Sequence, residues 1–322
     1  MTFDTYQPFL PPELILSVFD WIVPPSNTAV ALPPSHISTK TFLSLARTSS
    51  IIYPAARRLL YTHCLWIDSI QRLQGALASI RTHPFVLHHR RRPEVPILEH
   101  INSLYLSYDQ VSNSSAALLV LDFFTLIAPH LRRLVIDIPL RTFDSHYDWD
   151  QHRHARLTLG KAFLQLTAIE TFCSTRDELW LPTFKLESPW DALSILPAWP
   201  RLKTVALYNL DVSAANFWQA MGKLKNLETA VFTRCDGLEH SDLKAEWRKA
   251  CGDEQRPLDI VLVNVESQHR LPLGMAGWKE DEISVRQLNV PISYYGDEDA
   301  RELCQEWVKR RMLRGENPMV WD

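Results

Sequence analysis

Beyond residue 66 an apolar triplet recurs along the chain, and this repetition constrains the fold more than any other feature. In five occurrences an apolar residue is followed by others three and five positions later, so the last two share one face of a β-strand. A sixth, poorer match ends in Ser174. Successive triplets begin between 25 residues apart (202 to 227) and 38 residues apart (131 to 169). The triplets are Ile101-Leu104-Leu106, Leu131-Leu134-Ile136, Ile169-Phe172-Ser174, Leu202-Val205-Leu207, Leu227-Ala230-Phe232 and Leu258-Val261-Val263.

Helical segments are expected between these strands, over residues 116–127, 155–166, 214–224 and 241–251. Each strand with its helix leaves one apolar face open, and stacking the next unit closes that face. The pattern predicts an α/β fold in which a curved, mainly parallel sheet carries helices on its outer side. Its units are irregular and mostly longer than the roughly 20 to 29 residues of regular leucine-rich repeats. A generic α/β domain with alternating strands and helices explains the same pattern.

In a solenoid of this kind, the residues beside the apolar strand positions face the concave side of the sheet and form a binding surface. The predicted protein-binding residues are Tyr105, Arg133, Asp137, Tyr208, Thr233 and Asn264. Tyr105, Arg133 and Tyr208 are the strongest candidates, because aromatic residues and arginine dominate interface hot spots. A final helix over residues 296–313 is expected to cap the open end of the array.

Ahead of the repeats, residues 1–66 predict a small module of three short helices. The first begins at Pro11 and Pro12, because proline fixes φ and the first helical turn does not need its missing N–H. Five apolar side chains then gather on one face of this helix. They are Leu14, Ile15, Val18, Phe19 and Ile22.

The second helix is expected from about Ser38, with Phe42 and Leu45 on its buried side, and the third from Pro54, with Leu59 facing inward. Helices this short bury little apolar surface, so the module needs a partner or a following domain to cover it. The first helix, taken alone, is also compatible with a core helix of an ordinary domain.

Three blocks of the module resemble the F-box, especially as found in fungal proteins: Leu10-Pro11-Pro12-Glu13-Leu14-Ile15, Leu43-Ser44-Leu45-Ala46-Arg47-Thr48-Ser49 and Ala56-Arg57-Arg58-Leu59-Leu60-Tyr61. The repeats loosely resemble the leucine-rich-repeat-like domains that often follow fungal F-boxes. The resemblance implies that residues 1–66 dock on the Skp adaptor of an SCF-type (cullin-RING) E3 ubiquitin ligase. Residues 67–322 would then recruit the protein substrate. The residues implied to contact the adaptor are Leu10, Pro11, Pro12, Leu14, Ile15, Val18, Phe19, Ile22, Leu45 and Leu59.

Composition and charge restrict the classes of partner. The chain has 322 residues, of which 46% are hydrophobic and 22% charged, as expected of a globular protein with a substantial core. Lys and Arg total 34 against 37 Asp and Glu, a formal net charge of −3, so no positive excess favours nucleic acid. The sequence predicts no secretory leader and no membrane span. The five cysteines form no CxxC pair, which favours reduced thiols in a cytoplasmic or nuclear protein.

Motifs for catalysis are scarce, and the chain is expected to be no enzyme and to need no cofactor. It contains no GxSxG, HExxH or GxxxxGK[ST] motif and only 9 glycines. One remote alternative is a metal-dependent enzyme built on the insertion 144–154, where six ligand residues alternate and would share one side of an extended segment. They are Asp144, His146, Asp148, Asp150, His152 and His154. A nearer alternative is a repeat scaffold that binds a partner protein without any ligase.

Overall fold

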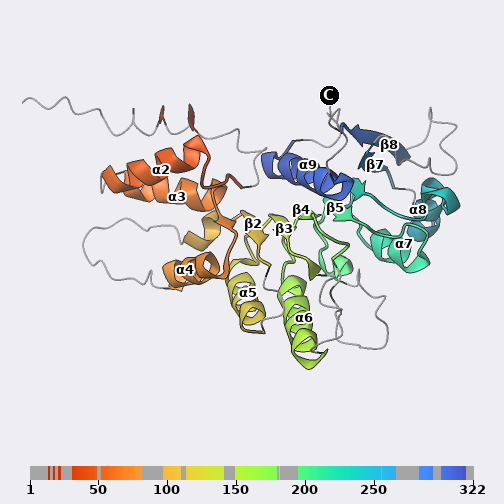
Figure 1. Cartoon of the computed structure of the whole chain (residues 1–322), viewed down its shortest axis with the longest axis horizontal. Coiled ribbons are helices and arrows are strands. Elements are labelled where there is room, and N and C mark those ends of the chain that lie inside the picture. The colour runs from red at the N-terminus through yellow and green to blue at the C-terminus, as the bar shows by residue number, and fades with distance from the viewer. Residues whose placement is uncertain are drawn as a thin grey trace, which may run out of the picture.

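Eight parallel strands form one open sheet in the computed structural model of the chain (Figure 1). The structure describes residues 14, 17, 18, 21, 22, 31–48, 52–81, 97–109, 114–140, 149–179, 181, 195–254, 256–265, 283–292 and 299–316, and gives only the backbone of residues 149–153. The strands lie side by side in chain order, and each pairs in parallel with the next. They are β1 (Trp66–Ile67), β2 (Ser103–Ser107), β3 (Arg133–Asp137), β4 (Thr171–Ser174), β5 (Thr204–Tyr208), β6 (Thr229–Thr233), β7 (Leu258–Val265) and β8 (Ile283–Val290). The predicted α/β class with a mainly parallel sheet is confirmed.

The apolar triplets set the register of the central strands. The second members of the first five triplets lie at equivalent positions of β2 to β6: Leu104, Leu134, Phe172, Val205 and Ala230. All five are fully buried in the larger apolar core, between the sheet and its helices. The triplet spacing therefore predicted correctly which side chains of these strands point toward the helices.

In β7 the prediction was wrong by one residue. Ala230 of β6 pairs with Ile260, and not with Val261, the second member of the sixth triplet. Successive side chains of a strand point to opposite faces, so a slip of one residue exchanges the two faces of the whole strand. Asn264, predicted to lie on the concave face, shares the face of Ile260 and Leu262, which belong to the helix-covered core.

Helices cover one face of the sheet, and in Figure 1 α5 and α6 lie below the strands. They are α4 (Ile70–Arg81), α5 (Ser114–Ile127), α6 (Trp149–Leu164), α7 (Ala215–Gly222) and α8 (Leu243–Cys251), with short 3-10 turns η1 (Ile97–His100), η3 (Leu196–Ala198) and η4 (Leu238–His240). The last four α-helices match the four predicted segments, whereas α4, β1 and β8 were not predicted. Among the described helices, none has the length and apolar content needed to cross a membrane.

An aromatic cluster fills the core between β4 and β5, where the described residues contain η3 and no α-helix. Trp199 follows η3, is fully buried and packs against Phe172 and Phe163, with ring centroids 4.8 and 6.4 Å away. Its indole Nε1 donates a hydrogen bond of 2.9 Å to the Phe163 carbonyl oxygen. Phe124 of α5 extends the cluster with an edge-on contact to Phe163 at 5.2 Å. The cluster therefore joins β4 to two neighbouring helices, with Trp199 contacting β4 and α6 and Phe163 contacting α5.

Gly222, the last residue of α7, faces the backbone of α8. A Cβ atom there would lie 2.8 Å from the Ala250 carbonyl carbon and closer still to its oxygen. We expect Gly222→Ala to lower the free energy of unfolding by about 1–3 kcal/mol, because the α8 backbone would have to move. Gly75 in α4 is the matched control: no atom lies within 4 Å of its would-be Cβ, so Gly75→Ala should raise that free energy by about 0.5–1 kcal/mol. Urea denaturation measures both, and a stabilising Gly222→Ala would contradict the close approach of α7 and α8.

The N-terminal module contains α2 (Ile37–Thr48) and α3 (Tyr53–His63), which pack against each other beside the β1 edge of the sheet (Figure 1). These two helices confirm the starts predicted near residues 38 and 54. The module has a small core of its own, in which Phe42 and Ala56 are fully buried. Because β1 spans Trp66–Ile67, the first strand of the sheet crosses the predicted domain boundary at residue 66.

The final helix, α9 (Ala300–Arg314), forms at the predicted place in the chain, but it does not pack where it was predicted to pack. It does not cap the end of the array. Instead it contacts β3, β6, β7 and β8, and in Figure 1 it lies above the sheet, opposite α5 and α6. The second face of the sheet is thus covered by α9 where the helix contacts β3 and β6 to β8.

Candidate functional site

One row of small apolar side chains crosses the sheet face opposite the α4–α8 helices. Val135, Cys173, Ala206, Val231 and Val261 occupy equivalent positions of β3 to β7, and all are buried. We call these five residues the sheet stripe. None of them is larger than valine, so the stripe is a smooth surface on which a helix can approach the backbone closely.

α9 seals this stripe through one of its faces. Cys304, Val308 and Met312 follow one another at intervals of four residues, which places them on the same side of the helix. They belong to the same apolar cluster as the sheet stripe, and none is more than 3% exposed. The concave face predicted to bind a partner is therefore occupied by α9.

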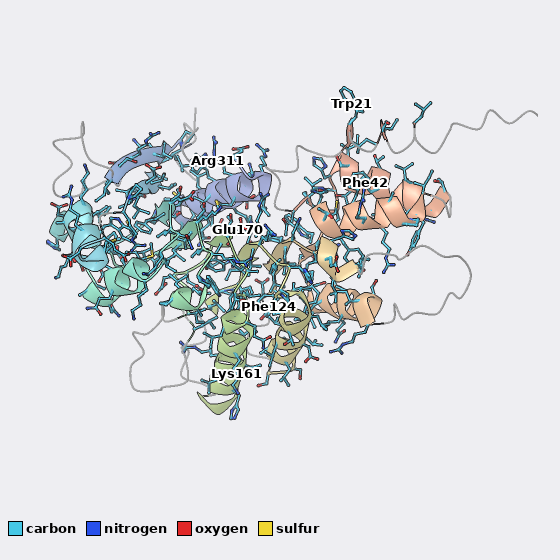
Figure 2. The ribbon with its side chains drawn as sticks, turned by 180° about the vertical axis from the view of Figure 1, so that it is seen from behind. Trp21, Phe42, Phe124, Lys161, Glu170 and Arg311 are labelled. Carbon is cyan, nitrogen blue, oxygen red and sulfur yellow. The ribbon has the colours of Figure 1, made fainter. Side chains whose placement is uncertain are left out.

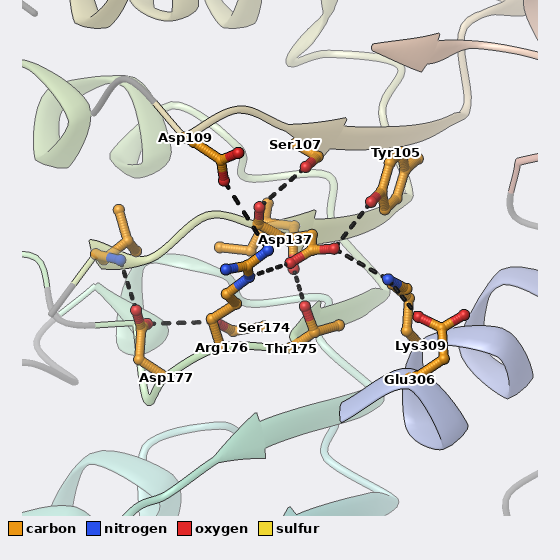
Figure 3. Close-up of polar contacts among 12 residues, drawn as sticks. Tyr105, Ser107, Asp109, Asp137, Ser174, Thr175, Arg176, Asp177, Glu306 and Lys309 are labelled. Carbon is orange, nitrogen blue, oxygen red and sulfur yellow. Dashed lines mark hydrogen bonds and ion pairs between the residues drawn. The ribbon is translucent and has the colours of Figure 1, made fainter. Parts of the chain in front are cut away.

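A buried carboxylate at the end of β3 links the sheet to α9 (Figure 3). Asp137 Oδ2 accepts hydrogen bonds from Lys309 Nζ of α9 at 3.1 Å and from Tyr105 Oη at 3.0 Å. Asp137 Oδ1 accepts a hydrogen bond of 2.6 Å from Arg176 Nε. Lys309 also pairs with Glu306, one turn earlier in α9, at 2.5 Å. Asp137 is thus surrounded by two cations and a hydroxyl group, a strong set of charge-assisted contacts.

The two cations determine the charge state of Asp137. Burial alone would raise the pKa of its carboxyl group, but the hydrogen bond from Arg176 and the charge of Lys309 lower the pKa below its ordinary value. For Lys309, burial would lower the pKa, but the hydrogen bond to Glu306 and the charge of Asp137 raise it. Asp137 and Lys309 are therefore both charged at neutral pH and hold α9 on the sheet at its third turn.

The six predicted protein-binding residues do not form an open surface. Four of them are buried: Tyr105, Asp137, Tyr208 and Thr233. Arg133 is half-buried, and Asn264 lies on the helix-covered side. Tyr105 is further covered by Trp66 of β1, because the two rings stack with centroids 3.9 Å apart. The structure brings Tyr105 and Asp137 into direct contact, but as members of an internal network.

The sequence prediction missed Arg176 and Lys309 as partners of Asp137. Lys309 lies 172 residues from Asp137 in the chain. No local pattern connects residues so far apart, because only the fold brings them together. The one available signal was Lys309, which follows the apolar Val308 in the final helix. It did not point to Asp137, because cations near a helix C-terminus are also favoured by the helix dipole.

The N-terminal module exposes apolar side chains that the rest of the described chain does not cover. Of the residues predicted to contact the adaptor, Leu14 and Val18 are each 52% exposed. Trp21 is 90% exposed and projects away from the ribbon in Figure 2, whereas Phe42 lies within the module. The sequence prediction did not single out Trp21 or the other large exposed apolar residues of the module, which are Ile37, Leu43 and Tyr53.

The remaining predicted adaptor residues fall into two groups. Ile22, Leu45 and Leu59 are half-buried and pack against the small core of Phe42 and Ala56, so they support the module from inside. The others lie outside the described residues: Leu10, Pro11, Pro12, Ile15 and Phe19. Leu14 and Val18 are thus the predicted adaptor residues that the described part of the module presents to solvent.

The insertion proposed to bind a metal is not an extended segment over its second half. α6 begins at Trp149, so residues 150, 152 and 154 are helical. Residues two apart on a helix are separated by about 200° and do not share a face, so the alternation cannot gather these three residues on one side. Asp144, His146 and Asp148 lie outside the described residues. Within the described part of the chain, no group of three or more His, Cys, Asp or Glu residues is placed to hold a metal ion.

We expect His63 to make the stability of the protein depend on pH. It is buried at the end of α3, and burial, followed by the charge of Arg133, lowers its pKa below 6.5. The unfolded state therefore takes up a proton first, and the free energy of unfolding falls as the pH drops below about 6.5. We expect lower stability at about pH 5.5 than at about pH 7.5, and a smaller difference for His63→Asn. Urea denaturation at both pH values measures this. The exposed His240→Asn is the control, and an unchanged pH dependence in His63→Asn would contradict the assignment.

A comparison with models of known protein families found no family that matches this chain, and a comparison with curated proteins found no relative.

Proposed function

We propose that this chain is a substrate-recognition subunit of an SCF-type E3 ubiquitin ligase. In this proposal, the N-terminal module is an F-box that docks on the Skp adaptor, and through it on the cullin. The α/β domain is an irregular leucine-rich-repeat-like solenoid that recruits a protein target. The chain supplies no chemistry of its own and acts by holding the target close to a ubiquitin-loaded enzyme, an effect of proximity that can be large.

The observation that carries this proposal is the exposure of Leu14 and Val18 on the N-terminal module. Large apolar side chains gathered on one small helical unit are typical of a protein-binding surface. Their positions match the face that the F-box resemblance assigns to the adaptor. The module also keeps a core of its own around Phe42, and Leu14 and Val18 are not among the residues that form it.

The direct test is to mix the purified chain with a purified Skp adaptor. We expect a stable one-to-one complex by size-exclusion chromatography with light scattering, and incorporation into a larger complex when the cullin is added. Absence of a complex with the adaptor would contradict the ligase proposal. It would leave the alternative of a scaffold that binds a partner protein through the α/β domain alone.

A further inference from the structure

The contact between α9 and the sheet has the form of a helix seated on a binding surface. The sheet stripe runs across five neighbouring strands, and its residues are small enough for any helix with an apolar face to lie on it. At the rim of the stripe, Asp137 offers a carboxylate that Tyr105 and Arg176 hold in place independently of α9. The surface under α9, which we call the seat, therefore consists of the apolar sheet stripe and the negative charge of Asp137.

α9 is held on this seat by side chains alone. Among the described residues, its main-chain hydrogen bonds are all within the helix or its own ends, and none reaches a strand. Two further ion pairs of α9 are local: Arg310 pairs with Glu306, and Arg311 pairs with Glu316. Detaching α9 would thus break an apolar seam and the Lys309–Asp137 contact but no part of the sheet ladder.

We propose that this sheet face is the binding site for an amphipathic helix of the target protein, and that α9 is an internal ligand which the target helix replaces. The contacts of α9 define the ligand: apolar side chains at positions i, i+4 and i+8, as in Cys304, Val308 and Met312, and a Lys or Arg at i+5 that reaches Asp137 as Lys309 does. The inference rests on the proposed function only in naming the bound helix as a ligase target.

A fluorescein-labelled peptide of residues 299–316 serves as the probe, with the full-length chain carrying Val308→Asp as its receptor. A charge at position 308 cannot remain in the apolar seam, so α9 should leave the sheet. We expect the peptide to bind this variant at least about tenfold more tightly than the wild-type chain by fluorescence anisotropy. A peptide with Lys309→Ala should bind about tenfold more weakly, because it lacks the cation for Asp137. The matched control receptor is Arg310→Ala, which alters an exposed residue of α9 and should bind the peptide as the wild type does.

Hydrogen exchange of the wild-type chain tests the same inference without a variant, and decides it if Val308→Asp fails to fold. We expect amides of α9 to exchange through an opening that leaves β3 to β6 protected. Exchange of α9 only together with those strands would overturn the inference, as would a folded Val308→Asp chain that does not bind the peptide. A wild-type dimer with exchanged α9 helices would also overturn it, because the seat would then belong to a second copy. None of these measurements contains the adaptor, so a chain that binds the adaptor but not the peptide overturns this inference alone.

Discussion

A chain that combines Leu14→Asp with Val18→Asp will no longer form a complex with the Skp adaptor. Both side chains are exposed at 52% in the chain itself, and in the proposed complex both would be buried against the partner. Buried apolar anchors at the centre of an interface often contribute 2 kcal/mol or more each, so the loss of two should weaken binding by at least about 100-fold. Placing two carboxylates in the interface adds the cost of burying unpaired charges. Isothermal titration calorimetry with the purified adaptor measures the change.

The matched control for this pair is Leu118→Asp. Leu118 is 54% exposed on α5, so it offers the same chemistry and exposure on a different part of the molecule. This control should bind the adaptor as the wild type does. Because exposed positions tolerate substitution, the Leu14 and Val18 variant should keep its free energy of unfolding within about 1 kcal/mol. Unchanged adaptor binding in a folded double variant would refute the docking surface.

Replacing Trp199 with alanine will destabilise the protein by about 3–5 kcal/mol. The side chain is fully buried and fills the space between Phe172 of β4 and Phe163 of α6, so its loss leaves a large cavity. The substitution also removes the donor to the Phe163 carbonyl oxygen, which would remain buried without that hydrogen bond. Urea denaturation followed by circular dichroism measures the loss.

Two controls separate the contributions of Trp199. Trp199→Phe keeps most of the ring volume and removes the indole N–H, so it should cost less than half as much as the alanine variant. Trp21→Ala removes an indole that is 90% exposed and should change the free energy of unfolding by no more than about 0.5 kcal/mol. If Trp199→Ala were as mild as Trp21→Ala, the aromatic cluster would not be the core of this part of the fold.

The sequence predicted the sheet register well from β2 to β6 and failed at β7 for a local reason. In β3 and β6 the apolar run is three residues long and has a polar residue at each end (Arg133 and Asp137, Thr229 and Thr233), so the two ends of the run mark one face. In β7, Ile260, Val261, Leu262 and Val263 are apolar at successive positions, so either phase satisfies the pattern. Only pairing with Ala230 of β6 selects Ile260 for the helix-covered core. The error at Asn264 followed from that ambiguity.

The insertion before α6 shows a second limit. Alternating His and Asp residues gave a plausible extended segment, but α6 begins at Trp149. Helix starts are decided partly by tertiary packing, and the α6 residues Ala155 and Leu159 are buried against the sheet. The helix therefore extends further toward its N-terminus than the local pattern indicated.

The sequence by itself determined the parallel α/β fold, the places along the chain of α2, α3 and α5 to α9, and the face of the central strands that meets the helices. These features depend on periodicities of 2 and 3.6 residues, which are local properties of the chain. Only the tertiary structure decided what covers the other face of the sheet. Apolar burial has no preferred direction, so the sheet stripe accepts any helix with a suitable face. The fold brings Lys309 beside Asp137 and thereby selects α9.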